Sequence, residues 1–278
     1  MMRSKTAAAP FALWMVLFTV IPLGIVLWFA FTNEAGDFTL ANLSSIVEYA
    51  GTFGLSIFLG AVATVICLVL AFPLAYNISR AKGRVQQTMV MIIMLPMWMN
   101  FLLRTYAWMS ILENNGFINQ IVRWFLEVIG IGGEGVTLQL INTNGAVILG
   151  MVYNFLPFMV LPLYSVMVKI DNSVIEAAQD LGSNVFQVFG RVVIPLSVPG
   201  MLSGITMVFV PAVSTFVITK LLGGSKTLMI GDTIETMFIG QGSDYHVGAT
   251  LSLVLMVLIL VCMAITGMAD KQGEEDAG

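Results

Sequence analysis

The chain has 278 residues, of which 58% are hydrophobic and 10% are charged, and its formal net charge is −4. Charged residues make up about a quarter of a soluble globular domain, so this composition, with a mean hydropathy of +0.93, excludes a soluble protein. A membrane span needs about 20 predominantly apolar residues. Uncharged stretches that can each hold one span occur at 6–33, 49–79, 85–103, 135–168, 192–219 and 245–269.

Helices are the favoured form of these spans, because a helix satisfies its own backbone polar groups in lipid, whereas a barrel needs strands of alternating polarity. We therefore predict an all-α integral membrane protein that forms one transmembrane domain over residues 1–278. The first span is longer than a typical signal-peptide core and is interpreted as an uncleaved helix. The predicted transmembrane helices lie at about 10–31, 53–78, 88–112, 144–168, 197–219 and 247–268.

Lysine and arginine residues predict the orientation, because cytoplasmic loops carry an excess of them. If the N-terminus is cytoplasmic, eight bases lie in inner loops, namely Arg3, Lys5, Arg80, Lys82, Arg84, Lys169, Arg191 and Lys271, against three in outer loops, Arg123, Lys220 and Lys226. We therefore expect a protein of the bacterial inner membrane, with both termini and the polar stretch at 171–195 on the cytoplasmic side. The outer loops carry nine acids, Glu134 among them. This negative outer face either attracts cations, or it arises only because the orientation rule keeps lysine and arginine out of the outer loops.

The polar stretch at 171–195 is typical of two short helices joined by a turn. Ser173 and Glu176 fit a capping box that begins a helix. Gly182 permits the left-handed turn that closes it, and Ser183 can cap the second helix. A small apolar stripe recurs at helical spacing in the first helix, formed by Val174, Ala177, Ala178 and Leu181.

This stretch resembles the EAA loop of the membrane subunits of binding-protein-dependent ABC importers. The matching residues are Glu176-Ala177-Ala178, then Gly182 after three intervening residues, and Val192-Val193-Ile194-Pro195 after nine further intervening residues. The resemblance implies a type I importer permease fold and a coupling helix that docks on a cytoplasmic ATPase through Glu176, Ala177, Ala178, Asp180 and Gly182. Glu176 either pairs with a base of the ATPase or only completes the helix cap.

A second resemblance concerns the cargo. The segments 95–108, 116–119 and 221–231 are similar to those of spermidine/putrescine permeases, and most similar to the first of two homologous permease subunits. The resemblance implies half of the translocation pathway for polyamines, a second homologous permease, two copies of the ATPase and an extracytoplasmic substrate-binding protein. Related permeases carry other small organic solutes, which remain an alternative cargo.

Carboxylates and aromatic faces bind ammonium groups, so both kinds of side chain are candidates for a polyamine pathway. The candidates are Trp98, Asn100, Arg104, Tyr106, Trp108, Asp232 and Glu235. Arg104 is the only charge well inside a span, and such residues usually face a bundle interior. Because a cation would repel the cargo, a structural bond from Arg104 to carbonyl groups or Glu113 is favoured. Asp232 and Glu235 share a face if their loop is helical.

No residue pattern indicates a catalytic or metal site. Gly223-Gly-Ser-Lys-Thr227 lacks the glycine spacing of a nucleotide-binding loop, so we expect no cofactor on this chain and ATP on the partner subunit. Cys67 and Cys262 fall within spans and are expected to be reduced. We expect contact with membrane lipid and none with nucleic acid. An ion-coupled secondary transporter is a weaker alternative, because it would need no ATPase-docking loop.

Overall fold

The computed structural model describes residues 10–130, 137–240 and 243–275, and the side chains up to residue 268. Arg3, Lys5, Glu134 and the side chains of the acidic C-terminal tail, including Lys271, lie outside the described residues. Within the described residues the chain is helical, with one isolated pairing of extended residues between Thr32 and Phe38.

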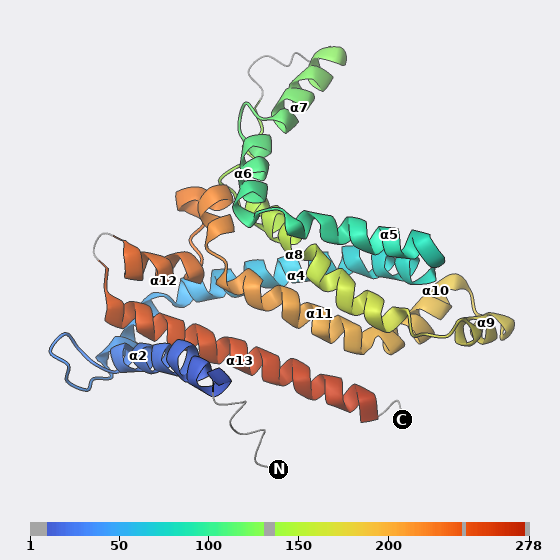
Figure 1. The fold of residues 1–278 in the computed structure, drawn as a ribbon. Coiled ribbons are helices and arrows are strands. Elements are labelled where there is room, and N and C mark those ends of the chain that lie inside the picture. The colour runs from blue at the N-terminus through green and yellow to red at the C-terminus, as the bar shows by residue number, and fades with distance from the viewer. Residues whose placement is uncertain (1–9, 131–136, 241–242, 276–278) are drawn as a thin grey trace.

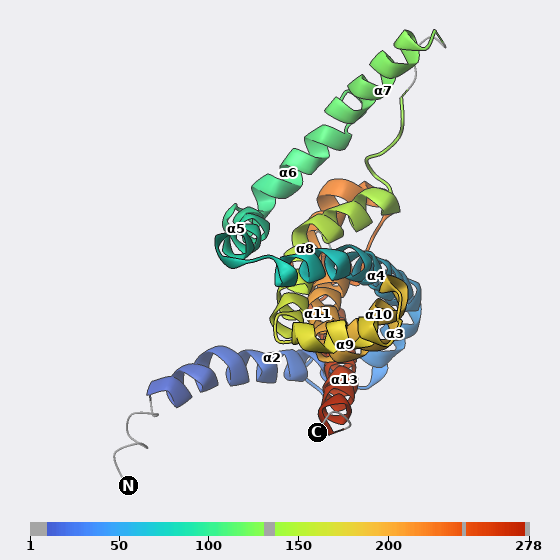
Figure 2. The same ribbon diagram turned by 90° about the vertical axis from the view of Figure 1, so that its right-hand side faces the viewer.

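Five helices are long and apolar enough to cross a membrane. They are Pro10–Ala30, which includes the π-helix η1 (Val16–Val20) and α2 (Ile21–Ala30), then α4 (Ala50–Arg80), α8 (Asn144–Met167), Val185–Ser214 and the first 24 residues of α13 (Tyr245–Glu275). Val185–Ser214 comprises α10 (Val185–Val188), the π-helix η4 (Phe189–Val193) and α11 (Ile194–Ser214). Figures 1 and 2 show α4, α8, α11 and α13 side by side in a bundle.

The third predicted span is not one continuous helix. Gly83–Trp98, formed by α5 (Gly83–Met94) and η3 (Leu95–Trp98), is followed after a break by α6 (Phe101–Leu112) and α7 (Phe117–Val128), and the two parts meet at 88°. The bend has a local cause. The Asn100 side chain accepts hydrogen bonds from the backbone nitrogens of Leu102 at 2.8 Å and Leu103 at 3.4 Å and so begins a new helix.

The core lies where α4, α8 and α11 meet. Among its fully buried side chains are Leu59, Met151, Leu163, Ile218 and Leu222. The backbones of α11 and α8 approach closely, because a Cβ at Gly200 would lie 2.9 Å from the Pro162 carbonyl oxygen and one at Gly204 would lie 2.6 Å from Met159 Sδ. These two glycines therefore serve packing within this chain.

The remaining short helices lie near the two ends of the bundle. The loop helices α9 (Asn172–Asp180) and α10 lie at one end and α12 (Ile230–Ile239) at the other (Figure 1). The chain also forms η2 (Ala41–Ser44), α3 (Ser45–Glu48), η5 (Thr219–Gly223) and η6 (Gly224–Lys226).

The residues that most often carry chemistry have packing roles here. Cys67 and Cys262 are both free thiols. His246 lies at the start of α13, where its Nδ1 is 3.0 Å from the Phe29 carbonyl oxygen and its ring meets the Phe29 ring edge-on. His246 therefore joins α13 to α2. No cluster of three or more metal-ligating side chains occurs in the described part of the chain.

Candidate functional site

The first loop helix begins earlier than the sequence predicts. Asp171, and not Ser173, is the N-cap of α9, because its carboxylate accepts a hydrogen bond from the Ser173 backbone nitrogen at 3.0 Å. This bond lowers the pKa of the Asp171 carboxyl. The prediction of a capping box between Ser173 and Glu176 is therefore wrong. Glu176 is exposed and does not cap α9.

Gly182 closes α9 in the way that its residue type predicts. Its φ is +85°, in the left-handed region that side chains with a Cβ rarely adopt. The Gly182 nitrogen donates to the Gln179 carbonyl at 2.8 Å and the Ser183 nitrogen donates to the Ala178 carbonyl at 3.1 Å. These two bonds form a Schellman motif. A Cβ on Gly182 would meet no other atom of the described residues within 4 Å, so the position is open outward.

The second loop helix, α10, is capped by Asn184 instead of the predicted Ser183. The Asn184 side chain accepts from the Gln187 nitrogen at 2.9 Å, and the Gln187 side chain accepts from the Asn184 nitrogen at 2.9 Å. This reciprocal capping box holds the start of a helix that then runs without a break through η4 into α11. The loop is thus joined to a span by continuous helix.

The loop has an inner apolar face that docks on the spans. Ile175, Val188 and Val193 are buried together against Phe72 and Tyr76 of α4. Three members of the predicted stripe on α9, Val174, Ala177 and Leu181, are exposed and do not belong to this inner face. Ala178 contributes to the inner face, but the main anchor is Ile175, which the sequence interpretation missed although it lies three residues before Ala178 on the same helix face.

The opposite face of the loop has no partner within the described residues. Leu181 and Phe186 are each 88% exposed, and Val174 and Val185 are exposed beside them. Apolar side chains this exposed are unusual outside the spans, because water solvates them poorly. We call these four residues, with Ala177, the outer loop surface. It is suited to bind another protein.

Arg80, at the end of α4, ties the loop to two spans. Its guanidinium donates to the carbonyl oxygens of Ile170 at 3.0 Å and Met167 at 3.3 Å, and to the Asn172 side chain at the start of α9. It also lies over the Tyr76 ring, 5.5 Å from the centroid. The sequence interpretation used Arg80 only for orientation. One side chain thus connects α4, the end of α8 and α9.

The candidate pathway residues of the third segment are not gathered in one place. Trp98 and Tyr106 are exposed, Asn100 serves as a helix cap, and Trp108 packs edge-on against Tyr153 at 5.3 Å. The expected bond from Arg104 to a carbonyl group or Glu113 is not found. Arg104 is buried over the Phe101 ring, and its Nε and Nη1 have no hydrogen-bond partner among the described residues.

The acidic pair at the other end lies on a short helix, as expected, but its members differ in environment. Asp232 is 2% exposed, and its Oδ2 accepts from the Met229 nitrogen at 3.1 Å while its Oδ1 has no partner in the described structure. Burial raises the pKa of this carboxyl, which lies outside the spans. Glu235 is partly exposed and forms an ion pair with Lys220.

Glu235 also lines a cavity of about 390 Å³ between the end of α11, α12 and α13. Its other walls include Ser214, Phe216 and Ser252, with apolar side chains completing the lining. A carboxylate in a mainly apolar cavity with one aromatic ring is chemically suited to an organic ammonium ion.

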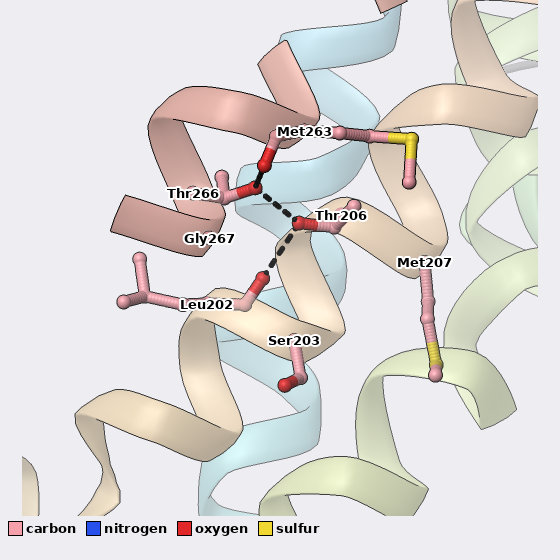
Figure 3. Close-up of a pocket in the computed structure, with 7 residues that line it drawn as sticks. All are labelled: Leu202, Ser203, Thr206, Met207, Met263, Thr266 and Gly267. Atoms are coloured by element: carbon pink, nitrogen blue, oxygen red, sulfur yellow. Dashed lines mark hydrogen bonds between the residues drawn. The ribbon is translucent and has the colours of Figure 1, made fainter. Parts of the chain in front are cut away.

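A second cavity, of about 340 Å³, lies between α11 and α13 (Figure 3). Two of its hydroxyl groups already have partners, because the Thr206 hydroxyl donates to the Leu202 carbonyl at 3.0 Å and lies 2.9 Å from the Thr266 hydroxyl. It has no charged side chain in its lining, which consists of Leu202, Ser203, Thr206, Met207, Met263, Thr266 and Gly267. Of these two cavities, the one beside Glu235 is the better match for a cationic cargo.

Comparison with solved structures identifies the fold. The chain matches a chain of a bacterial ABC transporter involved in the import of the acidic polysaccharide alginate, with a TM-score of 0.78 and 16% identity, over 96% of this chain and 94% of that chain. It also matches a chain of the MetNI methionine ABC transporter in an inward-facing conformation, with a TM-score of 0.55 and 15% identity, over 81% and 95% of the two chains. The predicted all-α fold of an ABC importer permease is confirmed.

Sequence relatives identify the family. The spermidine/putrescine transport system permease protein PotB of Haemophilus influenzae is 34% identical over 93% of this chain and 91% of its own length. The protein of the same name in Escherichia coli is 33% identical over 94% and 97%. Residues 6–271 match the model of the binding-protein-dependent transport system inner membrane components. The chain belongs to this family and is therefore a multi-pass membrane transport subunit, not an enzyme.

Proposed function

We propose that this chain is one of two homologous permease subunits of an ATP-driven importer and forms half of the translocation pathway for polyamines such as spermidine and putrescine. The observation that carries the proposal is similarity over more than nine-tenths of the chain to the spermidine/putrescine permeases of two bacteria. The outer loop surface adds physical support, because it offers a docking site to a protein in water at the end of a membrane bundle.

The proposed assembly contains a second permease, two copies of a cytoplasmic ATPase and an extracytoplasmic binding protein that delivers cargo. ATP binds to the ATPase, so this chain needs no cofactor of its own. The excess of bases in the inner loops supports a cytoplasmic position for both termini and for α9 and α10. In this orientation α12 and the cavity beside Glu235 face the outside, where cargo arrives.

The loop residues are suited to transmit force. We assign the contact with the ATPase to the outer loop surface together with Glu176, Asp180 and Gly182. When the ATPase pair closes on ATP, α9 moves with it, and Arg80 passes the displacement to α4 and α8. The unbroken helix from α10 to α11 carries the same motion into a third span. Alternating access follows from rigid-body rocking of these spans.

Gly182 gives a direct test of docking. An L-residue in the left-handed region costs about 1–2 kcal/mol, and asparagine tolerates this region better than other residues with a side chain. Gly182→Leu should abolish uptake and cargo-dependent ATP hydrolysis while the chain still inserts into the membrane. Gly182→Asn separates the causes. If Asn restores uptake, the turn conformation is what matters, and if it does not, the ATPase approaches this position too closely for a side chain. Normal uptake by Gly182→Leu would refute the assigned contact.

We infer that Glu235 contacts the cargo, because its carboxylate now holds the Lys220 ammonium and can exchange it for a cargo ammonium. A hydrogen bond to a charged group contributes about 1.5–3 kcal/mol, so Glu235→Gln should weaken cargo affinity about 10–100-fold. Ser203→Ala, in the uncharged cavity between α11 and α13, is the matched control and should leave affinity unchanged. Equal apparent affinities for both variants and the original chain would contradict the inference.

The other candidates are assigned less direct roles. Asp232 is buried, its Oδ1 has no partner among the described residues, and it can meet cargo only if α12 shifts during transport. Trp98, Tyr106 and Trp108 remain proposed as aromatic contacts along the path. Asn100 begins α6 at the bend that shapes the path, and Arg104 remains proposed as a residue beside the path.

Uptake measurements in a strain that lacks this chain test the cargo. Restoring the chain should restore accumulation of radiolabelled spermidine or putrescine, and excess unlabelled polyamine should compete. If polyamine uptake is unaffected by the deletion, the alternative of another small organic solute takes its place. Uptake that persists when ATP is depleted but collapses with the ion gradient would instead indicate an ion-coupled secondary transporter.

A further inference from the structure

Helix α7 is strongly amphipathic and projects from the bundle. Its large apolar residues Phe117, Ile121, Trp124, Phe125 and Val128 recur at helical spacing and are each between 47 and 64% exposed. Figures 1 and 2 show α6 and α7 extending away from the bundle. No described part of this chain covers the apolar face of α7.

The direction of α7 relates it to the membrane. The pair α6–α7 meets α5 at 88°, and α5 runs beside the spans of the bundle (Figure 1). A helix at a right angle to the spans lies in the plane of the membrane. The bend occurs at the end of the bundle opposite α9 and α10. Helix α7 is therefore placed at the level of one membrane surface.

Asn119 fixes which face of α7 points toward the membrane. It is 1% exposed, its side-chain nitrogen donates to the carbonyl oxygens of Glu113 at 3.1 Å and Leu138 at 3.0 Å, and its side-chain oxygen accepts from the Leu138 nitrogen at 2.8 Å. The returning segment 137–143 lies on the side of α7 that faces away from α9 and α10 (Figure 1). The Asn119 face of α7 is thereby turned outward.

At about 100° per residue, the centre of the apolar face lies opposite Asn119 on the helix. The charged residues Arg123 and Glu127 lie on the Asn119 side, and Gln120 lies at the border between the two faces. The apolar face therefore points back toward the membrane, and the polar face points to water. Trp124 and Phe125 are side chains that favour the boundary between lipid headgroups and acyl chains.

From this geometry we propose that α7 is an interfacial helix that lies on the membrane surface with Phe117, Ile121, Trp124, Phe125 and Val128 inserted into the lipid. The occupant is lipid, because large apolar side chains are also exposed between α7 and the spans, at Leu103 and Met99, and along α5, which runs beside the bundle. The helix would brace the bent segment of the chain against the bilayer and so hold Trp98 and Arg104 at a fixed depth.

Spin-label accessibility in the assembled importer, held in phospholipid nanodiscs, tests the proposal. Labels are attached to cysteines at Ile121 and Phe125 on the apolar face and, as the matched control, at Glu127 on the Asn119 side, in a chain carrying Cys67→Ala and Cys262→Ala. At Ile121 and Phe125 we expect high accessibility to oxygen and low accessibility to a water-soluble nickel chelate. The control should show the reverse.

Two results would overturn the proposal. Nickel accessibility at Ile121 and Phe125 would place the apolar face in water, and low accessibility to both reagents would show that protein, such as the second permease or the binding protein, covers it. A second measurement keeps both native cysteines. The contribution of Trp124 to the tryptophan fluorescence is the difference between the original chain and Trp124→Phe. This contribution should be quenched by lipids brominated near the headgroup and not by aqueous iodide. The opposite quenching pattern would contradict insertion. Neither measurement depends on the cargo.

Discussion

Replacing Arg80 by alanine removes the contacts that join the cytoplasmic loop to α4 and α8. Each hydrogen bond to a charged group contributes about 1.5–3 kcal/mol. Arg80 is half-buried, so the lower value suits its bonds to the carbonyl oxygens of Met167 and Ile170, and together they contribute about 3 kcal/mol. Its position over the Tyr76 ring adds about 0.5–1 kcal/mol. The variant should loosen the loop without unfolding the spans, whose core lies elsewhere.

The assay measures cargo uptake and ATP hydrolysis in the same proteoliposomes. If Arg80 transmits the motion of α9, Arg80→Ala should lower uptake per ATP hydrolysed at least about tenfold, since about 1.4 kcal/mol corresponds to a factor of ten. Arg80→Lys should lose part of the coupling, because an ammonium group lacks the planar fork that reaches several acceptors. Arg84→Ala is the matched control, since Arg84 is a nearby exposed base. Equal ratios for Arg80→Ala and Arg84→Ala would refute the assigned role.

Three further predictions concern stability. Gly200→Ala should lower the thermal midpoint of the purified chain more than Gly204→Ala does. The new methyl group meets the Pro162 carbonyl oxygen in the first variant and the flexible Met159 side chain in the second. The reverse order of the two midpoints would contradict the packing described for α11. Asp232→Asn should raise that midpoint at neutral pH. Because burial raises the pKa of Asp232, its ionised form destabilises the fold, so this gain should shrink as the pH falls toward 3.8, and a gain independent of pH would exclude the charge as its cause. The pKa of Asp171 is lowered, so its ionised form stabilises the start of α9. The Ser173 amide should therefore lose hydrogen-exchange protection as the pH falls below 3.8, and Asp171→Ala should remove this pH dependence.

Composition and charge spacing predict the straight spans well, because an uncharged run of about 20 residues has few alternatives to a membrane helix. Gly182 was predictable for a similar reason, since few residues other than glycine adopt its backbone conformation. The helix start in the loop was not, because Asp171 and Ser173 can both cap a helix. Burial of Ile175 against α4 accompanies the earlier start, and that contact depends on tertiary structure.

Two other features needed the three-dimensional structure. In the sequence, Asn100 is compatible with a polar position in a pathway and with a helix cap. The bend between η3 and α6 shows that it caps α6. Arg80 reads as a marker of orientation, because its partners Met167, Ile170 and Asn172 follow it by 87 to 92 positions in the chain. Sequence spacing carries no information about a contact of that separation.

Reconstituted transport tests the central claim most directly. This chain, a second permease and an ATPase encoded beside it are placed in proteoliposomes with ATP inside and the binding protein and radiolabelled spermidine or putrescine outside. The account predicts saturable accumulation of polyamine that requires ATP and this chain. Accumulation no greater than in liposomes without this chain, or accumulation that continues without ATP, would contradict it.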